Sequence, residues 1–184
     1  MNALRASLAS LLALLLVAGC GGSGATMSYE PSSDQTTYRT RSYTVSSISG
    51  ANFASAKSIN LRAVGRCQGQ NCTPESVQLV FSASGNSALS LSGLEGEIVA
   101  NGTTIEWTSS EAGQASADVG DDELINVVGN FATVDVSLSQ LEQIATASSV
   151  EGTIGGTSLN LNRGIQSGFQ NFLQKIRSGS SGST

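Results

Sequence analysis

The chain has 184 residues, with nine Lys and Arg against 14 Asp and Glu, no His, and 5% aromatic residues. With a net charge of −5 and no basic cluster, it lacks the grouped Lys and Arg that hold phosphate, which argues against nucleic acid as a partner. The absence of His removes His-based triads, Cys–His dyads and most zinc sites, and with them the usual general base. No cofactor is predicted.

The first 20 residues carry the clearest signal in the sequence. Arg5 precedes an apolar run at 8–17, and small residues follow, which is the order typical of a signal peptide. The run is shorter than the ~20 apolar residues that cross a bilayer as a helix. Residues 16–20, Leu-Val-Ala-Gly-Cys, resemble the lipobox of bacterial lipoproteins. By that resemblance Cys20 is acylated on its sulfur and becomes the mature N-terminus. An ordinary secretory signal with a Cys at this place by chance is the alternative.

The lipobox resemblance also implies a location in the cell envelope. Gly21 stands where an Asp tends to hold lipoproteins of Gram-negative bacteria at the inner membrane. The family pattern therefore implies the outer membrane, with the domain facing the periplasm. Several acyl chains on one residue anchor it stably, because each buried methylene contributes ~0.8 kcal/mol. The expected partners are the membrane, through the lipid, and a second envelope protein.

Composition divides the chain into four parts. Residues 1–19 form the signal peptide, and 20–36, rich in Gly, Ser and Thr without apolar periodicity, are predicted to be a lipid-anchored flexible tether. Residues 37–177 have the length and apolar content of a single globular, β-rich domain. The Ser/Gly tail at 178–184 is predicted to be disordered.

Period-two alternation of apolar residues predicts a series of strands within this domain. Asn101-Gly102 supplies the positive φ angles of a type I′ turn and predicts a hairpin within 97–107. Gly155-Gly156 marks a second hairpin within 149–161. Further strands are predicted at 37–47, 57–66, 76–83, 123–128 and 131–138, with a loop at 108–122.

Two stretches have a helical period instead. Ser137 and Gln140 match a capping box, which predicts a short helix that ends near Ala147. Apolar residues spaced i, i+4, i+7, i+8 and i+11 predict a second, amphipathic helix at 165–176. The sequence thus predicts an α+β, mainly antiparallel β domain of hairpin-linked strands, with the C-terminal helix packed on the sheet. Residues 131–177 resemble the C-terminal part of small bacterial lipoproteins of uncharacterised function, and this resemblance transfers no activity.

Cys67 and Cys72 lie between two of the predicted strands. An even pair in an exported protein predicts a disulfide, here one that closes a very small ring. A zinc site is the alternative, but it needs four ligands, and the sequence offers neither a His nor a second Cys pair.

An acidic run at 118–123 contains Asp118, Asp121, Asp122 and Glu123. Carboxylate oxygens suit Ca²⁺, but the spacing of ligands in an EF-hand is missing. An acidic loop that is simply solvated is the alternative.

The other candidate site residues lie near the first hairpin. Glu95 and Glu97 would share one face of a strand, ~7 Å apart, as a pair of hydrolytic carboxylates could; a solvent-facing strand edge is the alternative. Trp107, with Glu106 beside it, would mark a ligand-binding surface. One Trp at the end of an apolar strand also fits a core or rim residue.

Three functions follow from these patterns. The first is a membrane-anchored envelope lipoprotein whose domain is a non-enzymatic, partner-binding or structural module. The second is a small-ligand or carbohydrate binder with a pocket between sheet and helices, near Trp107. The third is a carboxylate-based hydrolase. An enzyme is not expected, because the chain has no His, no G-x-S-x-G or S-x-x-K motif, and nothing that marks Lys57 as desolvated.

Overall fold

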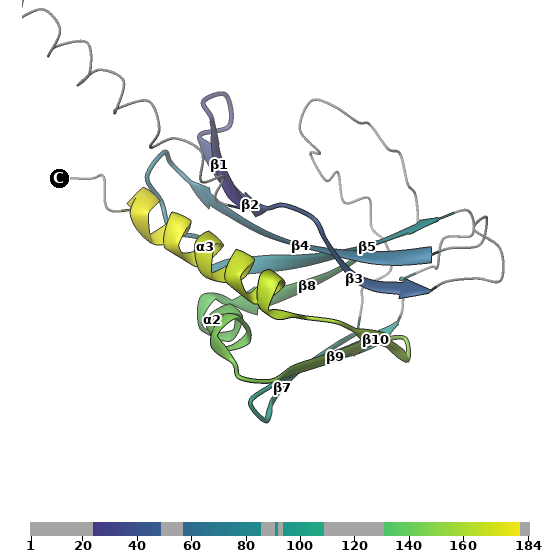
Figure 1. Cartoon of the computed structure of the whole chain (residues 1–184). Helices are drawn as coiled ribbons and strands as arrows, with labels where there is room; N and C mark the ends of the chain where they lie inside the picture. The colour runs from purple at the N-terminus through teal and green to yellow at the C-terminus, as the bar shows by residue number, and fades with distance from the viewer. Residues whose placement is uncertain (1–23, 49–56, 86–90, 92–93, 109–130, 181–184) are drawn as a thin grey trace, which may run out of the picture.

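The computed structural model describes residues 24–48, 57–85, 91, 94–108 and 131–180. These residues form a single α+β domain, mainly of antiparallel strands, with two helices (Figure 1). The predicted fold class is confirmed. The predicted signal peptide with Cys20 and the strand predicted at 123–128 lie outside the described residues.

The larger sheet has six strands in the order β1-β2-β4-β5-β8, and β3 also pairs with β4. β4 is twelve residues long, so β2 pairs with its second half and β3 with its first half. The strands are β1 Ala25–Glu30, β2 Gln35–Thr40, β3 Tyr43–Ile48, β4 Lys57–Gln68, β5 Ser76–Gly85 and β8 Phe131–Ser137.

The hairpin formed by β1 and β2 corrects two predictions. Residues 25–36 were expected in a flexible tether, but they form β1 and the start of β2, paired from Ala25↔Thr40 to Glu30↔Gln35. The single strand expected at 37–47 is two strands, because the chain breaks between β2 and β3 at Arg41-Ser42. β1 has few apolar residues, so local alternation does not mark it, and its contacts with β2 and with helix α3 (Arg163–Ser180) hold it in place.

The smaller sheet has four strands in the order β10-β9-β6-β7. Asn101 and Gly102, with φ of 49° and 83°, turn the chain between β6 and β7, as the Asn-Gly signal predicts. Gly155 and Gly156, with φ of 54° and 75°, join β9 to β10. The strands are β6 Glu95–Ala100, β7 Thr103–Thr108, β9 Val150–Ile154 and β10 Thr157–Leu159.

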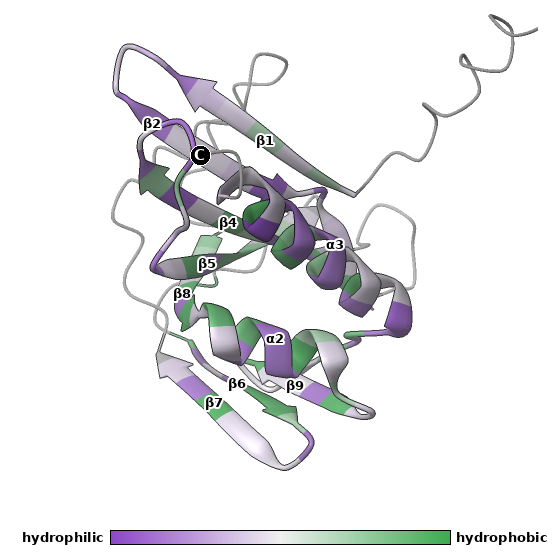
Figure 2. Ribbon diagram, turned by 90° about the vertical axis from the view of Figure 1, so that its left-hand side faces the viewer, coloured by the Kyte–Doolittle hydropathy of each residue, from purple (hydrophilic) through white to green (hydrophobic). Residues whose placement is uncertain are grey.

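Two helices pack against the sheets (Figures 1 and 2). Helix α2, Leu138–Thr146, begins with the predicted capping box: the Ser137 hydroxyl accepts the Gln140 N–H, and the Gln140 side chain accepts the Ser137 N–H. Helix α3 ends at Ser180, so residues 178–180 are helical and not part of a disordered tail. Its apolar face is buried, as its periodicity predicts.

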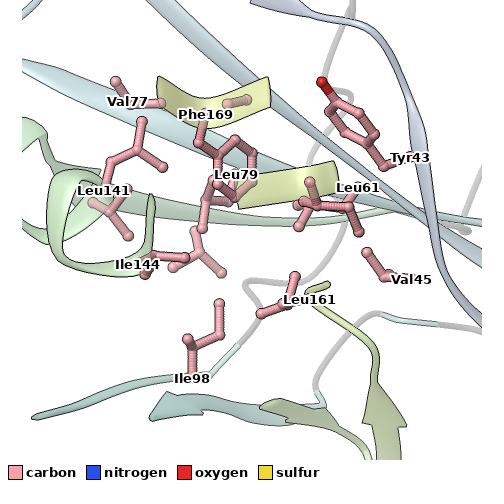
Figure 3. Packing of buried hydrophobic residues seen from close by; sticks show 14 of the residues in the cluster. Tyr43, Val45, Leu61, Val77, Leu79, Ile98, Leu141, Ile144, Leu161 and Phe169 are labelled. Atoms are coloured by element: carbon pink, nitrogen blue, oxygen red, sulfur yellow. The ribbon is translucent and has the colours of Figure 1, made fainter. Parts of the chain in front are cut away.

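The core lies between the inner faces of the sheets and the two helices. Figure 3 shows Leu61 and Leu79 of the larger sheet against Phe169 of α3, with Leu141 and Ile144 of α2 beside them. Each of these side chains is at most 1% exposed. Full burial of one such side chain contributes roughly 1.5–3 kcal/mol, so the helices are part of the folding core.

Candidate functional site

The predicted disulfide joins Cys67, near the end of β4, to Cys72 in the connection from β4 to β5, with Cα atoms 5.8 Å apart. The connection is also held by β2. The Thr36 hydroxyl donates to the Gly69 carbonyl at 2.5 Å, and the Tyr38 hydroxyl donates to the Cys72 carbonyl at 3.0 Å. These contacts give the pair a structural role.

Trp107 and Glu106 lie on opposite faces of β7. The indole of Trp107 stacks on Phe81, with ring centroids 5.6 Å apart, whereas Glu106 is exposed. Gly96 lies opposite Trp107 in the sheet, and a Cβ added there would overlap the indole ring. Trp107 is therefore partly buried and packed against the core, and the structure does not bring it and Glu106 together as a ligand surface.

The outer face of the smaller sheet gathers four glutamates. Glu95 and Glu97 share this face of β6, as their spacing predicts, and Glu106 of β7 lies directly opposite Glu97. Glu151 of β9 lies opposite Val99, on the same face. The four strands contain no Lys or Arg. Sequence reasoning missed Glu151 because only the pairing of β9 with β6 brings it here.

A groove of about 640 Å³ borders this acidic face. It runs along β9 and β10 to the start of α3, and its lining includes Glu97, Glu151, Asn160 and Arg163. The Arg163 guanidinium donates to the carbonyls of Ala147 and Ser148, at 3.2 and 3.3 Å. Among the described residues that line the groove, none is aromatic, so Trp107 does not line it and no ring is available there to stack on a sugar.

The buried polar residues of the described part serve the fold. The Thr40 hydroxyl accepts the Ala63 N–H at 3.0 Å. The Gln166 amide donates to the carbonyls of Ile144 and Ala147, at 3.2 and 3.0 Å, and so ties α3 to the end of α2. Thr36 holds the disulfide loop, as described above.

Arg62 is half-buried on the outer face of the larger sheet. Burial, and to a lesser degree the charge of Arg39, lowers the pKa of its guanidinium. Its Nε atom is buried without a hydrogen-bond partner. Nothing in the sequence distinguishes Arg62 from the other arginines, because its burial depends on neighbouring strands.

Two other predicted features find no site in the described part of the chain. The acidic run at 118–123 lies outside it, and within it no three His, Cys, Asp or Glu side chains gather closely enough to hold a metal ion. Among the described helices, none is both long and apolar enough to span a bilayer.

No protein-family model matches the chain, and neither a curated protein nor a solved structure matches it. Function must therefore be inferred from the residues and their geometry.

Proposed function

We propose that the protein is a lipid-anchored envelope lipoprotein whose domain acts without catalysis, as a partner-binding or structural module. Its anchor is the acylated Cys20 of the lipobox-like residues 16–20. Gly21 favours the outer membrane, with the domain in the periplasm.

One observation carries the binding role: the described domain presents at its surface a groove of about 640 Å³ that is lined by both polar and apolar residues. Glu97 and Glu151 line that groove beside the other glutamates of the outer face. Like charges directly opposite one another, such as Glu97 and Glu106, destabilise a sheet. A partner with basic side chains would relieve this repulsion and gain complementary contacts. The proposed partner is therefore a second envelope protein with a basic surface.

The anchor is tested by Cys20→Ser in cells that make the full chain. The variant should stay unprocessed and should lack added acyl mass in mass spectrometry, because its sulfur is the attachment point. The matched control is Cys67→Ser with Cys72→Ser, which should still be acylated. Normal processing and normal membrane retention of Cys20→Ser would contradict the proposal.

The partner is tested by crosslinking in intact cells, followed by purification from solubilised envelope. A protein captured by the wild type should be lost with Glu97→Gln and Glu151→Gln together. Glu75→Gln with Asp135→Asn, which removes two exposed carboxylates elsewhere, is the control and should keep the partner. Equal capture by both double variants would show that the acidic groove is not the binding surface.

A second candidate function is binding of a small ligand or carbohydrate in the same groove, since its volume lies in the usual range for ligand sites, ~300–1,000 Å³. Binding of oligosaccharides to the purified domain, measured by calorimetry and abolished by Asn160→Ala, would favour this function over a protein partner.

A further inference from the structure

The folded domain begins very close to the proposed anchor. Strand β1 starts at Ala25, and the carbonyl of Gly24 already accepts a hydrogen bond from the Arg41 N–H at 3.0 Å. Only residues 21–23 lie between Cys20 and Gly24. Four residue steps span at most ~14 Å even when fully extended.

This reach is short compared with the domain. A chain of this size folds to a radius of gyration of ~15 Å, which corresponds to a sphere of ~40 Å diameter. The acyl chains therefore hold the end of the domain that bears Gly24 near the lipid headgroups, and the domain cannot turn its opposite end to the bilayer.

The surface around Gly24 is polar and carries one cationic side chain, that of Arg41. Arg41 is exposed at the turn between β2 and β3, with its guanidinium 5.0 Å from the centroid of the Tyr43 ring. Among the described residues it forms no ion pair. Arg41 to Thr44 and the start of α3, at Asn162, Gly164 and Ile165, line a shallow hollow of about 320 Å³ that contains no carboxylate.

The opposite end of the β1–β2 hairpin is acidic. Glu30 ends β1 and Asp34 lies in the turn that follows, and the six residues of β1, or ~20 Å of strand, separate this end from Gly24. Figure 2 shows this separation, with the start of β1 and the first turn of α3 at one side of the domain and the β1–β2 turn at the other. Anionic lipid phosphates attract the cationic Arg41 at one end of the hairpin and repel the carboxylates of Glu30 and Asp34 at the other.

We propose that the end of the domain formed by Gly24, Arg41, Ser42 and the start of α3 rests on phospholipid headgroups, with the Arg41 guanidinium on a lipid phosphate. The β1–β2 turn then points away from the bilayer. This inference depends on the proposed acylation of Cys20.

The test places a fluorophore at either end of the hairpin in the full, acylated protein. Ser42→Cys and Ser33→Cys, both at exposed serines, are labelled and reconstituted into phospholipid vesicles that carry a quencher on their headgroups. Quenching should be several-fold stronger at position 42 than at position 33. Arg41→Gln should reduce that difference, and twenty Gly/Ser residues inserted after Gly21 should abolish it.

Mass spectrometry of each labelled protein separates the possible failures. Absence of acyl mass on Cys20 would overturn both the proposed function and this orientation. Acylated protein with equal quenching at both positions, or stronger quenching at 33, would overturn the orientation alone. A longer linker that leaves the difference unchanged would show that the short connection does not orient the domain.

Discussion

The indole ring of Trp107 lies nearly parallel to the ring of Phe81, with 5.6 Å between centroids and 15° between planes. Phe81 belongs to β5 of the larger sheet and Trp107 to β7 of the smaller one, so this contact joins the two sheets. A stacked pair contributes roughly 0.5–1.5 kcal/mol beyond the area that it buries. The one Trp in the chain therefore contributes to packing between the two sheets. The glutamates lie on the other, outer face of the smaller sheet.

Trp107→Ala should lower the free energy of unfolding by about 3 kcal/mol, because it removes the stack and leaves a cavity. Trp107→Phe should cost less, since it keeps a ring over Phe81 and removes an indole N–H that has no hydrogen-bond partner. Urea unfolding measures both. Glu106→Ala, an exposed neighbour, is the control and should change stability by less than ~0.5 kcal/mol. An unchanged stability of Trp107→Ala would contradict a core role.

Tyr38 should make the domain sensitive to high pH. Burial raises the pKa of its hydroxyl, which donates to the Cys72 carbonyl. A pKa raised in the folded state gives stability that is fully present below the unfolded pKa, ~10, and is lost as the pH rises through the folded value. At pH 7, Tyr38→Phe should lower the free energy of unfolding by ~1 kcal/mol, because the hydrogen bond to the Cys72 carbonyl is lost. As the pH rises above 10, the variant should lose less stability than the wild type, because it has no hydroxyl to ionise at this position.

Unfolding free energies at pH 7 and pH 10.5 measure this difference. Tyr29→Phe is the comparison: its pKa is also raised, chiefly by the hydrogen bond to Asp34, but Tyr29 lies at the hairpin surface, where solvent screens the effect. Parallel losses of stability in the wild type and Tyr38→Phe between the two pH values would contradict the prediction.

Reduction of the disulfide should lower the free energy of unfolding by about 2 kcal/mol, because the bridge closes a ring of only a few residues. The domain should stay folded, since Thr36 and Tyr38 still hold the loop through its carbonyls. Thermal melts with and without reductant measure the effect. The double variant Cys67→Ser, Cys72→Ser should melt like the reduced wild type and should not respond to reductant; a response would indicate that the reductant acts elsewhere.

Helix α3 should be essential for stability. Its buried residues include Phe169 and Phe172, at 1% and 0% exposure. Phe172→Ala should cost ~3–5 kcal/mol, a large part of the ~5–15 kcal/mol that holds a typical domain together. Truncation after Gly164 should leave the chain unfolded in circular dichroism. Gln174→Ala, exposed on the same helix, should melt like the wild type. A normal melt of Phe172→Ala would show that the helix is free to dock elsewhere.

Local patterns in the sequence predicted the elements whose formation depends on near neighbours. The capping box of Ser137 and Gln140 and the turn at Asn101-Gly102 are built from residues at most three apart, so their chemistry is readable directly. The ring from Cys67 to Cys72 is equally local. The apolar period of α3 and the alternation in β4 and β5 predicted which faces are buried, because burial follows the pitch of a helix or strand.

Other features of the domain depend on contacts between residues far apart in the chain, and local patterns do not predict them. β1 is a strand because β2 and α3 pack on it, although its own sequence resembles a linker. Trp107 packs against the core because β7 places it over Phe81. Glu151 lies with Glu95, Glu97 and Glu106 because β9 pairs with β6. Local sequence patterns thus identified the buried faces of β4, β5 and α3, and residues 16–20 carry the lipobox-like pattern from which the anchor is proposed. Which faces meet depends on long-range packing, and that packing formed the groove and set the start of the domain within a few residues of Cys20.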